Sequence, residues 1–369
     1  MKIGIVCPYN VALPGGVQQH VFEQAKELRQ LGHEVKVITP KPRGKVLTDD
    51  AEIIFLGTSA RIKTPQHTSV DVSVSVTPEA IDDLLDREKF DVIHMHEPLV
   101  PLLARQMLPR LRCPVVGTFH AAIPETVVGK SIAGSISPFI KSIVKHLNAV
   151  TAVSKPATSY IGNYVNEKDI YLIPNGVDID SYSEKNTNRK RSGVLYVGRL
   201  EKRKGVAYLI SAFAKLLEKQ SKIKLTIAGD GPDKTKLQKQ CAELGITDNV
   251  EFVGYVSESE KKNLLHNCAL FVSPALYGES FGIVLIEAMA AGAVVVGGNN
   301  AGYASVLSGR GAISLVNPLD DELFASRMNV LLNDEDLRTL WRAWAKNEVQ
   351  QYSYKKIVAS YQRIYKELV

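Results

Sequence analysis

The chain has 369 residues, of which 45% are hydrophobic and 23% are charged; this balance excludes a disordered protein and leaves room for two globular domains. No apolar run approaches the roughly 20 residues of a membrane span, and the N-terminal apolar run is too short for a signal peptide, so we expect a cytoplasmic protein. The net charge of +6 suits polyphosphate ligands, an anionic membrane surface or nucleic acid, and does not choose among them.

The first half of the chain alternates strand and helix patterns, which predicts a parallel sheet. An apolar strand at residues 2–7 leads through a loop to Gly15-Gly16, and a helical pattern covers residues 17–31. Strands are also predicted at 34–39, 52–56, 70–76, 91–96, 114–119 and 149–153, with helices at 78–88, 100–111 and 138–147. The two glycines can present bare N–H groups to a phosphate, or can serve a tight turn alone.

Three histidines lie at the ends of two predicted strands. His94 and His96 alternate along one strand and therefore share a face, but no third ligand is near in sequence, so we expect no metal. His120 follows a strand end, where an open α/β sheet binds ligands; a core histidine bonded to backbone is the alternative. The four cysteines lack CxxC spacing, so we expect free thiols. Residues 125–137, rich in Gly, Ser and Thr, are expected to serve as an acceptor or lid region.

A domain boundary is predicted at the polar run 183–192, which gives domains of residues 1–183 and 193–351. Residues 174–180, just before it, are predicted to form a turn because Asn175-Gly176 favours one. Asp178 and Asp180 spell a DxD pattern of the kind that can hold a metal, but we favour the turn interpretation.

The second half repeats the strand–helix series. Strands are predicted at 194–197, 224–228, 250–252, 270–274 and 293–296, with helices at 206–218, 234–244, 283–291 and from residue 320 onward. The first of these strands runs into a glycine-rich turn that contains Arg199 and Lys204. Cations at such a turn suit a diphosphate, and a surface charge run is the competing interpretation.

Residues 278–298 combine a glycine loop, a short apolar helix and a buried strand. A helix start preceded by glycines favours anions, through its free N–H groups and its dipole. Glu279 lies in the loop and Glu287 inside the apolar helix, where an ionised carboxylate needs hydrogen-bond partners such as a pair of sugar hydroxyls. Alternatively, Glu279 is a first-turn charge favoured by the helix dipole, and Glu287 reaches solvent.

Taken together, these motifs resemble the retaining, nucleotide-sugar-dependent glycosyltransferases of family 4. The markers are Pro14-Gly15-Gly16, Gly117-Thr118-Phe119-His120, Pro174-Asn175-Gly176-Val177-Asp178, Gly198-Arg199 with Lys204-Gly205, and Glu279 with Glu287. Within the family the chain looks most like the phosphatidylinositol α-mannosyltransferases, through Val6-Cys7-Pro8-Tyr9, His94-Met95-His96-Glu97-Pro98 and residues 278–287. The resemblance implies an α/β protein of the GT-B fold, with two Rossmann-like domains facing each other across a cleft.

The resemblance also implies the domain roles and the site residues. The acceptor domain would be residues 1–183, completed by an amphipathic helix at 352–369 that crosses back to it, and the donor domain would be residues 193–351. The implied catalytic residues are His120, Glu279, Arg199 and Lys204. The implied donor-binding residues are Gly15, Gly16, Gly198, Gly229, Gly231, Val256, Glu258, Ser280, Phe281, Gly282, Ile283, Val284 and Glu287. Acceptor-binding roles fall to Tyr9 and Gln18.

The implied reaction transfers a hexose with retention from a nucleotide diphosphate sugar, with GDP-mannose the favoured donor and no metal or other cofactor required. The favoured acceptor is a phosphatidylinositol-type lipid at the inner membrane face, and nucleic acid is not an expected partner. The alternatives are a UDP-sugar with another lipid or polysaccharide acceptor, a nucleotide-sugar 2-epimerase, and a non-catalytic nucleotide-sugar sensor. Residues 78–89 are acidic where the membrane-binding mannosyltransferases of the family carry a polybasic segment. The chain therefore departs from the mannosyltransferase pattern in features that concern the acceptor. Glu258 either accepts from guanine or faces solvent.

Overall fold

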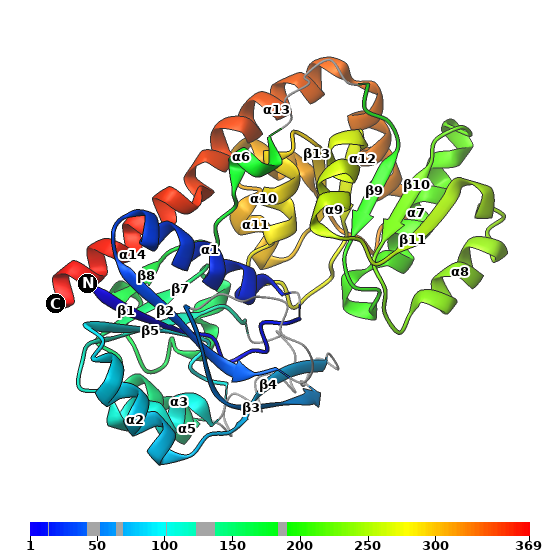
Figure 1. The fold of residues 1–369 in the computed structure, drawn as a ribbon. Coiled ribbons are helices and arrows are strands. Elements are labelled where there is room, and N and C mark those ends of the chain that lie inside the picture. Colours follow the sequence, from blue (N-terminus) through cyan, green and yellow to red (C-terminus); the bar gives the residue numbers. More distant parts are fainter. Residues whose placement is uncertain (14, 43–51, 64–68, 101, 123–136, 184–189) are drawn as a thin grey trace. The chain divides into compact units, whose positions relative to one another are not determined.

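The computed structural model describes residues 1–13, 15–42, 52–63, 69–100, 102–122, 137–183 and 190–369, which divide into two compact units (Figure 1). The first unit comprises Met1–Gly176 with Tyr354–Val369, and the second comprises Val177–Ser353. The predicted lid segment lies outside the described residues except for its final residue, and so does most of the predicted linker.

The first unit is built on an eight-stranded sheet with the strand order β4-β3-β2-β1-β5-β6-β7-β8. The strands are β1 (Lys2–Val6), β2 (Glu34–Lys41), β3 (Ile53–Lys63), β4 (Ser69–Ser75), β5 (Val92–His96), β6 (Val115–Phe119), β7 (Ala149–Ala152) and β8 (Ile170–Leu172). Neighbouring strands are parallel except for β3 and β4, which form an antiparallel edge pair. The order reverses between β1 and β5, so the carboxyl ends of these strands lie at the point where open α/β sheets bind ligands.

Helices cover both faces of this sheet: α1 (Gly16–Gln30), α2 (Pro78–Glu88), α3 (Leu103–Met107), α5 (Ser137–Val144) and α14 (Tyr354–Leu368), with short 3₁₀ helices at Leu108–Arg110, Pro156–Tyr160 and Glu167–Asp169. On one face, Ile3 and Ile5 of β1 pack with residues of α1 and α14. On the other face, Val6 packs with residues of α2, α3 and α5. This alternation along β1 follows from the two-residue period of a strand.

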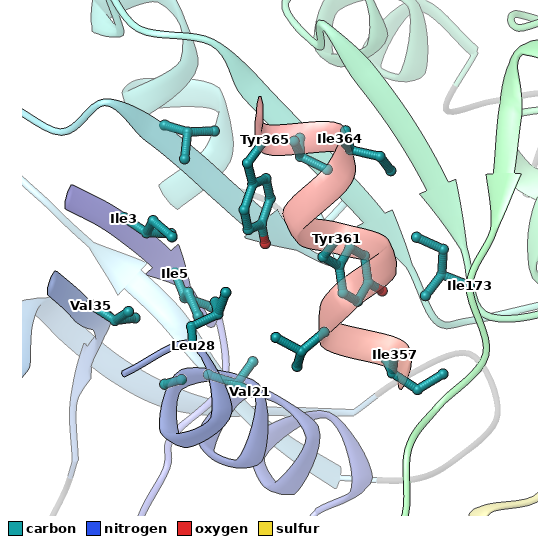
Figure 2. Packing of buried hydrophobic residues seen from close by; sticks show 14 of the residues in the cluster. Ile3, Ile5, Val21, Leu28, Val35, Ile173, Ile357, Tyr361, Ile364 and Tyr365 are labelled. Atoms are coloured by element: carbon teal, nitrogen blue, oxygen red, sulfur yellow. The ribbon is translucent and has the colours of Figure 1, made fainter. Parts of the chain in front are cut away.

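Helix α14 completes the first unit (Figure 2). Tyr361 and Tyr365 are fully buried beside Ile3, Ile5 and the α1 residues of the same cluster, as the close-up shows. The amphipathic pattern predicted from the sequence is confirmed, because all five of its apolar and aromatic positions are buried: Tyr354, Ile357, Tyr361, Ile364 and Tyr365. The Tyr354 ring packs so closely on Gly176 that a Cβ there would lie 2.4 Å from it, which explains why the Asn-Gly turn requires glycine.

The second unit has an all-parallel six-stranded sheet in the order β11-β10-β9-β12-β13-β14. Its strands are β9 (Val194–Val197), β10 (Leu225–Ala228), β11 (Val250–Gly254), β12 (Leu270–Ser273), β13 (Val294–Gly298) and β14 (Leu315–Val316). Its helices are α6 (Ile179–Tyr182), α7 (Val206–Lys219), α8 (Lys234–Glu243), α9 (Glu258–Asn267), α10 (Ile283–Ala290), α11 (Ala301–Val306), α12 (Asp321–Asn333) and α13 (Glu335–Glu348), with 3₁₀ helices at Lys202–Lys204, Thr247–Asn249, Gly309–Ser314 and Val349–Tyr352. The strand order reverses between β9 and β12, which again marks the expected ligand edge.

The unit boundaries differ from the predicted 183 and 352. The chain joins the second unit at Val177, and Tyr354 is the first residue to return to the first unit. The segment 177–182 belongs to the second unit because Tyr182 is buried there: its carbonyl accepts a hydrogen bond from His266 Nε2 at 2.7 Å, and its hydroxyl donates to Glu258 at 3.2 Å. Asp178, the first residue of the DxD pattern, caps α6 by accepting from the Ser181 N–H at 3.1 Å.

Several elements differ from their predicted extents. Strand β3 continues well past residue 56 to form its hairpin with β4, and the helix predicted at 100–111 is a short α3 followed by a 3₁₀ turn. Strand β8 and helices α9 and α11 were not predicted from the sequence patterns. Helix α9 starts with a capping box, in which Ser257 and Glu260 satisfy each other's backbone N–H groups.

Candidate functional site

The loop after β1 is closed by polar contacts of its own. Gly15 is extended, and α1 begins at Gly16. A Cβ at Gly15 would lie 2.3 Å from the Gln18 side chain, whose amide nitrogen donates to the Asn10 carbonyl at 3.4 Å. Tyr9 is half-buried, its carbonyl accepts from the Thr39 hydroxyl at 2.9 Å, and burial raises the pKa of its phenol. Tyr9 and Gly15 therefore lie in the loop after β1, and Gly16 and Gln18 lie in the first turn of α1, at the carboxyl edge of the first sheet.

Four buried histidines lie beside this edge, on the face covered by α1 and α14. His94 and His96 stack with their ring centroids 4.3 Å apart, which confirms that they share a face of β5. His120 lies within hydrogen-bonding distance of His96, 2.9 Å from Nε2 to Nδ1. His20 of α1 packs edge-on against His120, with centroids 5.4 Å apart. The strand pattern predicted two members of this cluster, and the fold adds His20 and His120.

Burial makes this cluster electrically neutral. It lowers the pKa of His20 to about 4 and lowers the pKa values of His94, His96 and His120 well below 6.5. Neither ring nitrogen of His20 has a hydrogen-bond partner within the described part of the chain. Across the described ranges, no three or more His, Cys, Asp or Glu side chains are arranged to hold a metal ion.

Glu97 fixes the backbone at His120. Its carboxylate accepts hydrogen bonds from the N–H groups of His120 and Ala121, both at 2.5 Å, and its own N–H donates to the Thr118 carbonyl at 2.8 Å. Glu97 has a φ of 47°, a left-handed conformation that few residues other than glycine adopt. Burial raises the pKa of this carboxyl to about 7. The motifs of the sequence did not predict Glu97 as a site residue.

The glycines of the second unit bring its loops into contact. Gly229 has a φ of 138°, and a Cβ there would lie 1.9 Å from the Gly198 carbonyl oxygen. A Cβ at Gly231 would lie 2.3 Å from the Leu200 carbonyl oxygen. The loops after β9 and β10 therefore pack backbone to backbone, which requires glycine at both positions. This packing is a structural role that exists beside any donor-binding role.

Glu279 is held by two cations from the turn after β9. Lys204 Nζ lies 2.7 Å and Arg203 lies 2.8 Å from the same carboxylate oxygen. The three side chains are 13 to 18% exposed, so the group is partly shielded from water. Arg199 is different: its side chain is 51% exposed and lies 3.7 Å from Glu201. The resemblance assigned Lys204 to the diphosphate and Glu279 to the hexose; the pairing of Lys204 with Glu279 was not predicted, and Arg203 went unnoticed in a run of three cations.

Helix α10 begins directly beyond Glu279. Gly282 is the N-cap with a φ of 115°, and a Cβ there would lie 2.8 Å from the Tyr303 ring. Ile283 and Val284 are the first two residues of the helix, so their N–H groups lie outside the helical hydrogen-bond pattern. Ser280 precedes this turn, and Phe281 is buried against the Tyr352 ring, with centroids 5.6 Å apart. The turn therefore has the anion-favouring geometry expected from the sequence.

Glu287 is buried within α10 and paired with a lysine. The Lys261 ammonium lies 2.9 Å from Glu287 and 3.0 Å from Glu258. Burial raises the pKa of Glu287, and Lys261 opposes the shift. The interpretation of Glu287 as reaching solvent is wrong, since the residue is 2% exposed. Glu258 is 63% exposed at its side chain, and Val256 is half-buried in the loop before it.

The predicted residues thus fall into two sets. Tyr9, Gly15, Gly16, Gln18 and His120 belong to the first unit, at the carboxyl edge of its sheet. The second unit holds Gly198, Arg199, Lys204, Gly229, Gly231, Val256, Glu258, Glu279, Ser280, Phe281, Gly282, Ile283, Val284 and Glu287. Within each unit most of these residues lie in loops and helix starts that follow the carboxyl ends of strands, on both sides of the order reversal.

Comparison with known proteins gives a consistent result. The family description "Glycosyltransferase Family 4" matches residues 14–181, and "Glycosyl transferases group 1" matches residues 178–348. The phosphatidyl-myo-inositol mannosyltransferase of Mycolicibacterium smegmatis is 32% identical to the chain, over 99% of this chain and 93% of the relative. The chain belongs to the family 4, group 1 glycosyltransferases. A further member, the phosphatidyl-myo-inositol mannosyltransferase of Mycobacterium tuberculosis, is 30% identical over 99% of this chain and 96% of the relative.

Solved structures of other glycosyltransferases share the fold. The sucrose-phosphate synthase of Thermosynechococcus elongatus matches with a TM-score of 0.79 and 20% identity, covering 100% of this chain and 98% of that one. Anabaena Alr3699/HepE in complex with UDP and glucose matches with a TM-score of 0.77 and 18% identity, covering all of both chains. The predicted GT-B class, with two Rossmann-like units, is therefore confirmed. Among the described helices of this family member, none is both long and apolar enough to cross a bilayer.

Proposed function

We propose that this glycosyltransferase transfers mannose with retention from GDP-mannose to a phosphatidylinositol-type lipid, at the inner face of the cell membrane. The observation that carries the donor chemistry is the carboxylate of Glu279 held between Lys204 and Arg203, next to the start of α10. The mannose and the lipid acceptor are inferred from relatives whose names state them.

In the second unit, the proposed leaving group is a diphosphate. When the bond between the sugar's anomeric carbon and the phosphate oxygen breaks, the electron pair goes to that oxygen. The charge that develops there is stabilised by the cations Arg199 and Lys204 and by the N–H groups at the start of α10. These groups require no metal. Glu279 is then the carboxylate that binds the hexose, oriented by Arg203 and Lys204.

Glu287 is proposed to bind the ribose hydroxyls. In the structure its charge is balanced by Lys261 at 2.9 Å, so ribose binding adds hydroxyl donors to an existing ion pair. The two carboxylates that flank Lys261, Glu258 and Glu287, form an anionic pair at this edge. Carboxylate oxygens can accept from the guanine N1–H and amino group, and uracil offers no matching pair of donors.

In the first unit, the proposed ligands are a phosphate oxygen at the Gly15-Gly16 turn and a sugar hydroxyl at His120. The acceptor hydroxyl forms the new bond to the anomeric carbon on the face that the phosphate leaves. Its proton passes to the departing phosphate oxygen, so that charge and atoms balance without an added base. Tyr9 and Gln18 are proposed to contact the acceptor. No residue is assigned as a covalent nucleophile.

The test is mass spectrometry of the product formed from GDP-mannose and phosphatidylinositol vesicles, with and without EDTA. A mannosylated lipid in both reactions is the expected result. Lys204→Met and Glu279→Gln should lower kcat/KM by roughly 10²–10³. Lys202→Met is the matched control, because Lys202 is an exposed lysine of the same turn and its loss should leave the rate within about twofold.

Other outcomes separate the alternatives. If GDP-mannose is left intact while a UDP-sugar is consumed, the proposed donor is wrong and the transferase class stands. If free nucleotide and an altered sugar form without acceptor, the chain is a 2-epimerase. If nucleotide sugars bind but are not turned over with any acceptor tested, the chain is a nucleotide-sugar sensor and the proposed transfer reaction is wrong.

A further inference from the structure

A chain of buried hydrogen bonds connects a backbone carbonyl of β6 to the ring of His120. It begins where the Thr151 hydroxyl donates to the Gly117 carbonyl at 3.4 Å, and Thr151 lies 2.5 Å from the Thr118 hydroxyl. Thr118 lies 2.6 Å from His94 Nε2. All of these side chains are completely buried, so each donor must find its acceptor inside the protein.

The second half of the chain passes through Gln24 of α1. Its amide nitrogen lies 2.8 Å from His94 Nδ1 and donates to the Tyr365 hydroxyl at 2.9 Å. Its carbonyl oxygen lies 3.0 Å from His96 Nε2, and His96 Nδ1 lies 2.9 Å from His120 Nε2. Gln24 is thus the link between the two histidines of β5.

The Gly117 carbonyl at the start of the chain determines which atom donates in each hydrogen bond that follows. A carbonyl oxygen accepts and never donates, so Thr151 donates to Gly117 and accepts from Thr118 at 2.5 Å; the single proton of Thr118 makes this bond in preference to the longer contact, 3.5 Å, with the Tyr361 hydroxyl. Thr118 then accepts from the Nε2–H of His94, whose Nδ1 is left as an acceptor for the Tyr365 hydroxyl at 2.5 Å and for the Gln24 amide N–H. The reverse direction would leave the bond from Thr151 to Gly117 unmade.

The same rule continues to His120. The Gln24 oxygen accepts from the Nε2–H of His96, so His96 Nδ1 is an acceptor and His120 must donate from its own Nε2–H. Burial keeps all three rings neutral, with one proton each. The proton of His120 is therefore on Nε2, and Nδ1 carries the lone pair.

We propose that Gln24 and His96 are positioning residues that hold His120 in the Nε2–H tautomer, so that Nδ1 accepts a hydrogen bond from a hydroxyl of the transferred sugar. The tautomer follows from the hydrogen-bond chain alone, and the sugar contact rests on the proposed function. A ring in this state has no proton at Nδ1 to give to a leaving group. The unprotonated Nδ1 can bind a hydroxyl, which donates a proton to it, but cannot bind an oxygen that only accepts hydrogen bonds.

The experiment uses the full chain labelled with ¹⁵N at histidine and reads the ring nitrogens by long-range ¹H–¹⁵N correlation. His120 is assigned from the signals that disappear in His120→Asn. In the wild-type protein we expect Nδ1 of His120 to show the shift of an unprotonated nitrogen and Nε2 that of a protonated one. A protonated Nδ1 overturns the proposal without any variant.

Two substitutions at Gln24 form a matched pair. Gln24→Met removes the acceptor for His96, so the Nδ1 signal of His120 should move toward the value of a tautomer mixture, and kcat should fall about tenfold with donor KM little changed. Gln24→Glu keeps an oxygen for His96 and, in the protonated form that burial favours, an O–H donor for His94 Nδ1, so both the signal and kcat should stay near wild type. An unchanged signal in a folded Gln24→Met protein contradicts the proposal.

The outcomes for tautomer and function are separable. If no sugar donor is turned over but the wild-type spectrum shows Nε2–H at His120, the proposed function fails and the hydrogen-bond chain stands. If transfer occurs with Nδ1–H at His120, the function stands and the assignment of Gln24 and His96 as positioning residues is wrong.

Discussion

The buried carboxyl of Glu97 should make the first unit less stable as the pH rises. Its pKa is raised from 4.5 to about 7 by burial, so folding favours the protonated form. Between these values the folded protein holds a proton that the unfolded chain has lost, and stability falls with pH. A shift of about 2.5 units at 1.36 kcal/mol each amounts to roughly 3 kcal/mol, fully lost above about pH 8.

The perturbation is Glu97→Gln, which can still accept from the N–H groups of His120 and Ala121 but cannot ionise. Hydrogen exchange of peptides covering β5 and β6 reports the opening free energy of the first unit alone. Comparing the two proteins at each pH cancels the intrinsic exchange rate. The opening free energy of the wild-type protein minus that of Glu97→Gln should decrease by about 3 kcal/mol from pH 4 to pH 8. A difference that stays constant, or that increases, refutes the reasoning.

Three further sets of substitutions test the packing. Gly229→Ala should destabilise the second unit by more than about 3 kcal/mol, because its Cβ would lie 1.9 Å from a backbone carbonyl oxygen. Gly245→Ala is the control: its φ is 68° and no atom lies within 4 Å of the added Cβ, so it should cost only about 1 kcal/mol of conformational strain. Lys261→Met should lower the free energy of unfolding by about 3 kcal/mol, because it leaves the Glu287 carboxylate buried without a countercharge, and adding Glu287→Gln should restore most of that loss. Urea unfolding of these four proteins, followed by the fluorescence of the two tryptophans of α13, measures the differences. Tyr365→Phe should cost about 1–2 kcal/mol in the first unit by removing a buried hydroxyl partner, which hydrogen exchange at β1 measures; no loss would mean that the hydroxyl is not part of the buried chain.

Local sequence patterns were sufficient for the elements whose period is set by burial. The helical spacing of Tyr354, Ile357, Tyr361, Ile364 and Tyr365 predicted the buried face of α14, since a helix that packs on one side repeats its apolar residues. The glycines before α10 likewise predicted the start of that helix. Helix α9 was missed because its apolar positions are few and its polar residues give no clear period.

The candidate site was predictable where a motif placed the residue, and unpredictable where a distant contact decides its role. Gln24 reads as one more polar residue of α1, yet it is buried because β5 presents two histidines to it from 70 and 72 positions away. Arg203 stands in a run of three cations, and the run itself does not reveal which side chain turns toward Glu279. The left-handed backbone conformation of Glu97 could not be predicted, because no glycine or asparagine at that position indicates it.

Helix α14 has a consequence for how the protein is made. Its buried aliphatic and tyrosine side chains complete a core whose remaining members, from Ile3 to Ile173, are translated before the whole of the second unit. On the ribosome the second unit can therefore fold as one continuous segment, while the first waits with an apolar face exposed until residues 354–368 emerge. Chaperones that bind nascent chains should accordingly associate with the β1–α1 face throughout synthesis of the second unit, and should be released when α14 docks.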